Sequence, residues 1–419
     1  MSGFRFPLSP LHSALPMSLF RSFKHRAFLL MWLGQTISRV GDFMYEIALA
    51  WWVLEKTGDA AMMGAVLVFA ITPSVLFYLI GGVAVDRFSR VGLMLASDTA
   101  RGAVVLLVSF LAFTDQLEIW EIFAASLFFG VVDAFFQPAF TALVPQIVPE
   151  EDLPSANSLS SMSINFGRVV GPAIGAGVIA LIGTPLAFLF NGLSFLASAA
   201  FLLPLLYMNI PRVASEKGAS VLREMREGIA TVFASQWLWI SIIIFALTNI
   251  TLSGPYSVAM PFLVNDNLGA SVETLGLLYA AFPLGYIIGG VFLGRYTRIR
   301  KRGWLMYSVG IVAALALAVF GLLPPLWVLV IAALINGAAL EMGHLTWINT
   351  LQELVPNEKL GRVVSIDNMG SFALLPIGFA LAGWATEQYG APIVFLIGGL
   401  FTALVSAAGL LVPAIRNLD

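Results

Sequence analysis

The sequence predicts an all-α integral membrane protein with twelve transmembrane helices in two pseudo-symmetric six-helix bundles. Of its 419 residues, 59% are hydrophobic and only 11% are charged, whereas a soluble domain has about 25% charged residues. The apolar residues form runs of about twenty, long enough to cross roughly 30 Å of hydrocarbon. The third observation is that patterns of the first half return in the second half.

Apolar runs separated by Gly, Pro and charged residues define the predicted spans. Those of the first half are 27–54, 60–83, 92–113, 118–139, 158–182 and 185–207. Those of the second half are 236–262, 272–294, 303–322, 325–348, 363–386 and 391–413. The predicted organisation is a tail at 1–26, a bundle at 27–207, a linker at 208–235 that ends in a short amphipathic helix, a bundle at 236–413 and a C-terminal segment at 414–419.

The basic residues predict the orientation of these spans. Of the 22 Lys and Arg residues, 18 fall in the segments on the side of the two termini, and the loops of the opposite side contain only Lys56. Cytoplasmic loops carry an excess of Lys and Arg. The tail has neither the apolar core nor the cleavage site of a signal peptide. We therefore expect a multi-pass protein of the cell (inner or plasma) membrane with both termini in the cytoplasm.

An internal repeat relates the two halves. The segment GGVAVDRFSR at 81–90 returns as GGVFLGRYTR at 289–298, and Val148-Pro149 returns as Val355-Pro356 at nearly the same offset. Two repeated features at nearly the same offset indicate that a unit of six spans is duplicated, with both copies in the same orientation. Transporters built in this way bind substrate between their halves near the middle of the membrane.

Composition excludes several classes of function. A net charge of −2 provides no basic surface for a nucleic acid. The absence of cysteine excludes disulfides, thiol catalysis and Cys-ligated metal, and three scattered histidines predict no metal site. Neither a catalytic triad nor a phosphate-binding glycine loop stands out. The chain is therefore predicted to be neither an enzyme nor a cofactor protein.

The first span carries the densest set of intramembrane polar groups: Gln35, Arg39, Asp42 and Glu46, whose spacing places them on one helical face. Such a face must contact protein or a water-filled cavity. Arg39 and Asp42 either neutralise each other or take part in transport. Glu46 has no cation on its own helix, and a carboxyl group in low-dielectric surroundings can load and release a proton. Asp42 and Glu46 are the first candidates for proton coupling.

Other spans add further candidates. These are Asp133 in span 4, Asn165 and Arg168 in span 5, Asn249 in span 7, Glu341 and His344 in span 10, and Asp367 in span 11. We expect Asp133, a third candidate for proton coupling, to pair with Arg168. Glu341 and His344 lie one turn apart, as either a hydrogen-bonded pair or a pH-sensitive gate.

Several motifs carry a family resemblance. Asp86-Arg87-Phe88-Ser89-Arg90 continues into Asp98 and Arg101, 136–145 reads FQPAFTALVP, and Gly171-Pro172 is followed by Gly175. With these motifs, almost the whole chain resembles the major facilitator superfamily, in particular its twelve-span drug:proton antiporter branch, which includes macrolide and siderophore exporters. Two departures from the motif are Ser89, which replaces a glycine, and Gly294, which stands where Asp86 would repeat.

The resemblance implies a mechanism and its residues. It implies a conformational latch, for which the candidates are Gly82, Asp86, Arg87, Arg90, Asp98, Arg101 and Asp367. The alternative role for the arginines of this latch is to anchor the loop at the cytoplasmic membrane surface by their positive charge. Gly171, Pro172 and Gly175 resemble the antiporter motif. The implied function is alternating-access export of small amphipathic molecules, driven by the proton gradient, by a monomer surrounded by lipid. The alternatives are a lysolipid or lipid flippase, an uncoupled facilitator, or a non-transporting sensor.

Overall fold

The computed structural model describes residues 20–210, 221–296 and 300–419, apart from the side chains of 78–86, 221–225, 357 and 358. Within these residues all regular secondary structure is helical, which confirms the all-α prediction. The helices of the first half are α2 (Arg26–Thr57), α3 (Ala60–Arg87), α4 (Arg90–Phe113), α5 (Ile119–Ile147), α6 (Leu153–Ile182) and α7 (Thr184–Leu202). Those of the second half are α9 (Gln236–Gly254), α11 (Val272–Leu293), α12 (Arg302–Ala318), α13 (Leu326–Leu354), α14 (Asn357–Phe372), α15 (Leu375–Tyr389) and α16 (Ala391–Leu411).

Eleven helical stretches of the described chain are long and apolar enough to cross a membrane. Helix α2 has 32 residues but is not among these eleven. Its apolar sequence is interrupted by the polar face from Gln35 to Glu46. It packs along α6 and α7, which are two of the eleven. The helices lie where the twelve spans are predicted, and the spanning role of α2 itself stays a prediction.

Two predicted spans differ in detail from continuous helices. Span 7 runs through π-helical turns at Pro255–Ala259 and Leu263–Asn267, which flank α10 (Met260–Phe262). Span 11 is divided into α14 and α15, with Pro376 in the first turn of α15. Proline lacks a backbone N–H and cannot donate to the preceding turn. Local shifts to other helical hydrogen bonds restore pairing of the neighbouring groups inside a membrane.

Glycines bring the helices of each half into close contact. A Cβ atom on Gly130 of α5 would lie 2.1 Å from the carbonyl oxygen of Ala70 on α3. A Cβ atom on Gly337 of α13 would lie 2.0 Å from the carbonyl oxygen of Phe282 on α11. Small residues let transmembrane helix backbones approach in this way. Because Gly130 and Gly337 are related by the offset of the internal repeat, the two bundles reproduce the same helix crossing.

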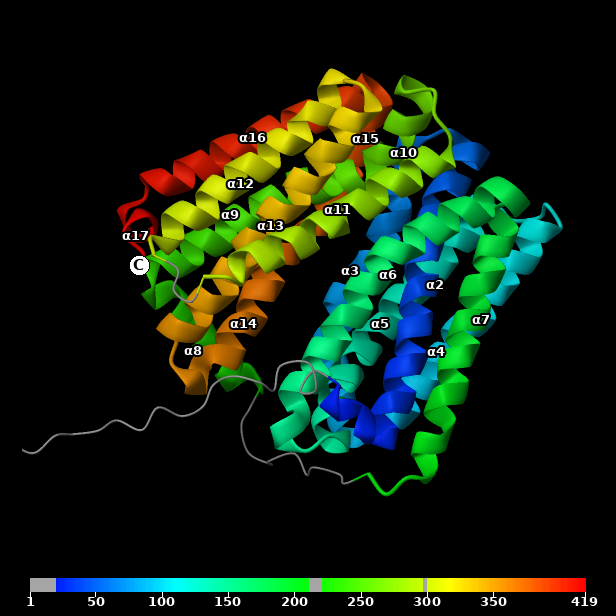
Figure 1. Cartoon of the computed structure of the whole chain (residues 1–419), viewed down its shortest axis with the longest axis horizontal. Helices are drawn as coiled ribbons and strands as arrows, with labels where there is room; N and C mark the ends of the chain where they lie inside the picture. The colour runs from blue at the N-terminus through cyan, green and yellow to red at the C-terminus, as the bar shows by residue number, and fades with distance from the viewer. Residues whose placement is uncertain (1–19, 211–220, 297–299) are drawn as a thin grey trace, which may run out of the picture.

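The two halves touch each other near one end of the molecule. Gly64 at the start of α3 lies against α15, where its Cβ position is 3.2 Å from the Cα atom of Gly383. Gly276 at the start of α11 lies against α6, with its Cβ position 2.4 Å from the Cβ atom of Ala176. Towards the other end, where α8 (Val221–Ala234) and α14 begin, the bundles diverge (Figure 1). The described conformation is therefore open at the end of the molecule where α8 lies.

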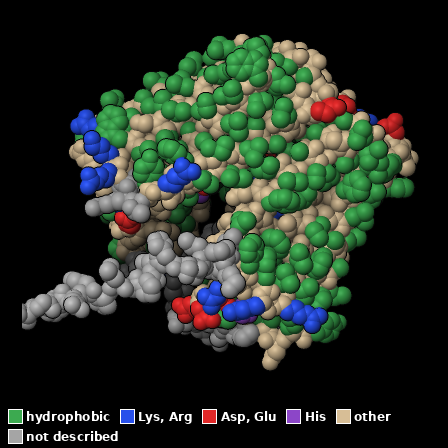
Figure 2. Space-filling view, in the orientation of Figure 1, with side chains coloured by type: hydrophobic (Ala, Val, Ile, Leu, Met, Phe, Trp, Pro, Cys, Tyr) green, Lys and Arg blue, Asp and Glu red, His purple; other side chains and the backbone are tan. Residues whose placement is uncertain are grey.

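The surface matches this architecture. Hydrophobic side chains cover the flanks in the space-filling view (Figure 2), and Lys and Arg side chains gather near α17 (Pro413–Arg416) and at the end where α2 begins. The same view shows a hollow between the halves. A lipid-facing flank needs apolar side chains, whereas charged groups are stable at the membrane surface. The open end is thus the end with basic residues.

Candidate functional site

The polar face of α2 changes environment along its length. Gln35 is 4% exposed, Arg39 and Asp42 are half-buried, and Glu46 is exposed. Gly41 holds α2 against α7, because a Cβ atom there would lie 2.1 Å from Ser194 Oγ. The polar face therefore runs from a closed protein interior to the space between the two halves.

The antiporter-like motif holds α2 from the other side. A Cβ atom on Gly171 would lie 2.5 Å from the Cβ atom of Phe43, and one on Gly175 would lie 2.7 Å from a methyl group of Ile47. Pro172 is buried in the same helix face. The physical role of the motif in this chain is close packing of α6 on α2, which sets the position of the polar face.

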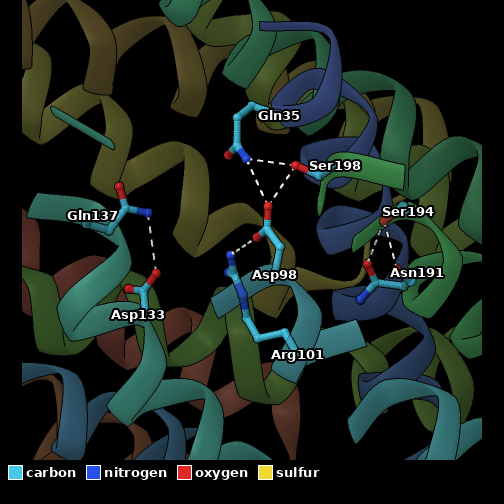
Figure 3. Close-up of polar contacts among 8 residues, drawn as sticks. All are labelled: Gln35, Asp98, Arg101, Asp133, Gln137, Asn191, Ser194 and Ser198. Atoms are coloured by element: carbon cyan, nitrogen blue, oxygen red, sulfur yellow. Dashed lines mark hydrogen bonds and ion pairs between the residues drawn. The ribbon is translucent and has the colours of Figure 1, made fainter. Parts of the chain in front are cut away.

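Gln35 belongs to a buried hydrogen-bond network around Asp98 (Figure 3). Gln35 Nε2 and Ser198 Oγ donate to Asp98 Oδ2 at 3.2 and 2.7 Å. Arg101 Nη2 donates to Asp98 Oδ1 at 2.6 Å. The side chains of Asp98 and Arg101 are 0% and 7% exposed. This network joins α2, α4 and α7 within the first half.

Aromatic rings complete the surroundings of Arg101. Its guanidinium carbon lies 4.3 Å from the ring centre of Phe136 and 4.5 Å from that of Phe195. Cation–π contacts of this kind favour the charged guanidinium in a dry environment. The structure thus places two predicted latch residues, Asp98 and Arg101, in a closed ion pair inside one bundle.

Two ion pairs that the sequence suggested are not formed among the described side chains: the pair of Arg39 with Asp42, which was one of two alternatives, and the expected pair of Asp133 with Arg168. The guanidinium of Arg39 lies 5.2 Å from the ring centre of Phe140 and makes no ion pair with Asp42. The expected pair between Asp133 and Arg168 is wrong: Asp133 Oδ1 instead accepts a hydrogen bond from Gln137 Nε2 at 3.4 Å (Figure 3). Gln137 lies one turn further along the same helix, α5. Asp133 therefore finds its hydrogen-bond donor within α5, and no side-chain pair links Asp133 to Arg168 of α6.

Glu46 lies where α2 meets the second half. The neighbouring Ile47 comes within 3.6 Å of a Cβ atom placed on Gly276 of α11. Tyr256 and Tyr279, both of the second half, lie within electrostatic range of Glu46. Arg168 of α6 is exposed and also within this range. Glu46 is therefore an exposed carboxyl group at the junction of the halves.

Asn165, one turn before Arg168 on α6, is half-buried. On the opposite wall, Tyr286 of α11 lies within electrostatic range of both Arg168 and Glu341. His344 Nδ1 lies 3.7 Å from Glu341 Oε2, within reach of an ion pair when the histidine is protonated but too far for a hydrogen bond. Charged groups from both bundles therefore line the space between them.

The remaining candidates lie in the second half or at the open end. Asn249 Nδ2 donates to the carbonyl oxygen of Ser371, and Asp367 accepts from Trp347 Nε1. Arg87 is exposed, and Arg90 Nη1 donates to the carbonyl oxygen of Ala142. The surroundings of Gly82 and the side chain of Asp86 lie outside the described part of the structure. Of the described latch candidates, Asp98 and Arg101 are paired with each other, whereas Arg87, Arg90 and Asp367 make no described hydrogen bond or ion pair with them in this conformation. The described residues form no group of metal ligands.

Sequence reasoning missed a contact between the two halves. The backbone N–H of Ala60, the first residue of α3, donates to Glu387 Oε2 of α15 at 3.2 Å. Asp59 caps the same helix end from within the first half, by accepting from the N–H of Ala61. A carboxylate at a helix N-terminus is favoured by the helix dipole. Glu387 therefore ties the halves together at their closed end, and an acid at the end of the predicted span 11 was the available signal.

Glu387→Ala is expected to shift the conformational equilibrium away from the described state by about 1 kcal/mol, the usual strength of such a cap. Distances between spin labels at Asn157 of α6 and Gln352 of α13, both exposed at the open end, measure this shift. The absence of native cysteine lets both labels be attached without background. Asp266→Ala is the matched control, because Asp266 binds only its neighbour Asn265 among the described contacts. An unchanged distance distribution in Glu387→Ala would contradict the assignment.

Comparison with known proteins relates the chain to membrane transporters. A family described as transmembrane secretion effector matches residues 17–419. The chain is 24% identical to macrolide efflux protein A of Streptococcus pyogenes, over 94% of this chain and 97% of the relative. It is 26% identical to the multidrug efflux pump Tap of Mycolicibacterium fortuitum, over 94% and 98%, and 26% identical to the enterobactin exporter EntS of Escherichia coli O1:K1, over 88% and 87%.

A solved structure supports the fold. A crystal structure of a point mutant of the nucleoside transporter NupG superposes with a TM-score of 0.73 at 15% identity, covering 92% of this chain and 99% of that one. The family and the efflux relatives confirm the prediction that the protein is a membrane transporter and not an enzyme. The chain belongs to the transmembrane secretion effector family of the major facilitator superfamily.

Proposed function

We propose that this transporter exports small amphipathic molecules by alternating access in exchange for protons, with Glu46 as the proton carrier. The observation that carries the proposal is the position of Glu46. It is an exposed carboxyl group, without an ion pair among the described residues, at the point where α2 meets α11. A group in this position changes its surroundings when the halves rearrange, and its affinity for a proton changes with them.

The orientation belongs to the same proposal. With both termini in the cytoplasm, the open end of the described conformation faces the cytoplasm, and the contacts at Gly64 and Gly276 close the outer side. Substrate would enter from the cytoplasm, and proton binding to Glu46 from outside would favour the return of the carrier. The efflux functions of the macrolide, drug and siderophore relatives support export as the direction. The location is then a bacterial plasma membrane.

The test is export of radiolabelled erythromycin from proteoliposomes with and without an imposed pH gradient. We expect Glu46→Gln to lose nearly all of the gradient-dependent component, because glutamine cannot release a proton. Removing one positioned proton-transfer group costs about 10²–10⁴-fold in rate. Asp266→Asn is the control, because Asp266 is an exposed acid whose described side-chain contact is with its neighbour Asn265. Full gradient dependence in Glu46→Gln would overturn the assignment of Glu46, and loss of it in Asp42→Asn alone would move the assignment to Asp42. Lipid movement without any pH dependence would favour a flippase.

A further inference from the structure

A cavity of about 230 Å³ lies inside the second half, between α9, α12, α13, α14 and α16. All of its lining residues belong to this half. It is therefore distinct from the surroundings of Glu46 on α2. Its wall combines aromatic rings with a single buried carboxylate, Asp367.

Asp367 is 6% exposed and accepts two hydrogen bonds. Trp347 Nε1 donates to its Oδ2 at 2.8 Å, and Ser371 Oγ donates to its Oδ1 at 3.1 Å. A carboxylate has about four acceptor positions, so two remain free. It forms no ion pair with Lys or Arg among the described side chains. A buried carboxylate of this kind is stable only with a compensating charge or a proton.

Aromatic side chains line the same cavity as this carboxylate. The ring of Phe245 meets that of Trp347 edge-on, with 4.9 Å between centres and an interplanar angle of 87°. It also stacks on Tyr307 at 6.4 Å. Aromatic faces attract alkylated ammonium groups, and a neighbouring carboxylate adds direct charge attraction. The side chain of His344, 63% exposed, marks the opening of the cavity.

We propose that this cavity binds the cationic group of an amphipathic substrate. The positive charge of an alkylated amine would contact Asp367, and its apolar substituents would pack on Phe245, Tyr307 and Trp347. This inference rests on the proposed export function and names the class of substrate. It assigns to Asp367 a role in substrate binding in place of the latch role that the family resemblance implies.

The test is binding of radiolabelled benzyltrimethylammonium to the purified full-length protein by equilibrium dialysis. Neopentylbenzene, which has carbon in place of the charged nitrogen, is the uncharged competitor. We expect the unlabelled cation to compete at least tenfold better than the neutral compound. Asp367→Asn, which keeps the size of the side chain, is expected to weaken cation binding at least tenfold. Asp266→Asn, at an exposed acid of the same half that does not line the cavity and that accepts a hydrogen bond from its neighbour Asn265, is expected to bind as the wild type does.

Phe245→Leu provides a second variant that leaves the carboxylate in place, and we expect it to weaken binding of the cation more than that of the neutral compound. Equal competition by the two compounds, or wild-type cation affinity in Asp367→Asn, would overturn the inference. Gradient-driven export together with cation binding that does not depend on Asp367 would overturn only the cavity assignment. Cation binding that depends on Asp367, without proton coupling, would overturn only the proposed antiport.

Discussion

Gly276→Leu is expected to deplete the described conformation and to reduce export to less than about a tenth of the wild-type rate. A Cβ atom at this position would already lie 2.4 Å from the Cβ atom of Ala176 and 3.0 Å from the carbonyl oxygen of Pro172. Both belong to α6 of the other half, so a leucine side chain separates the halves at their closed end. Overpacking of a close contact costs typically 1–3 kcal/mol, enough to shift a balanced two-state equilibrium roughly five- to 150-fold.

Spin labels at Asn157 and Gln352, both exposed at the open end, measure the outcome as a distance distribution. In Gly276→Leu the population with a short distance at this end is expected to dominate, because opening of one side accompanies closing of the other. Gly177→Leu is a close control: Gly177 follows Ala176 on α6, but a Cβ atom there meets nothing within 4 Å. If Gly276→Leu keeps the wild-type distance distribution and export rate, the halves do not need this contact.

Arg101→Met is expected to destabilise the first half by about 3–5 kcal/mol, the usual cost of leaving a buried charge without its partner. Asp98 would keep its bonds from Gln35 and Ser198 but lose the guanidinium 2.6 Å away. The contacts of Arg101 with the rings of Phe136 and Phe195 would be lost as well.

The unfolding midpoint in detergent, followed by intrinsic fluorescence, measures this loss. Lys56→Met is the matched control, because the pair of Lys56 with Glu118 has side chains that are 35% and 57% exposed. Such an exposed pair contributes about 0–1 kcal/mol. The double variant Asp98→Asn with Arg101→Met is expected to recover part of the loss, since it removes both charges. Equal midpoints for Arg101→Met and Lys56→Met would show that the buried pair does not stabilise the fold.

The helices and their duplication are visible in the sequence because hydrophobic length is a local property. Each predicted span coincides with helical residues, and the structure shows corresponding helix crossings at Gly130 and Gly337, which are separated by the offset of the repeat. Interruptions were harder to predict. The division of span 11 before Pro376 and the π-helical turns of span 7 depend on how neighbouring helices pair the freed backbone groups.

The partners of the intramembrane charges were less predictable, because a partner on another helix leaves no mark at a fixed spacing. The sequence favoured a pair between Asp133 and Arg168, whereas Asp133 accepts a hydrogen bond from Gln137 on the same helix. Ser198 donates a hydrogen bond to Asp98, but in the sequence it cannot be distinguished from any other small residue of an apolar helix. Only the packing of α7 beside α2 and α4 identifies it.

Proton release on substrate binding is the most direct test of the account. The purified protein, in weakly buffered detergent solution, is mixed with erythromycin while a pH-sensitive dye reports protons. We expect the wild type to release protons and Glu46→Gln to release none, although both bind the drug. Asp266→Asn, at an exposed acid outside the space between the halves, should behave as the wild type. If Glu46→Gln binds erythromycin and releases as many protons as the wild type, Glu46 is not the proton carrier.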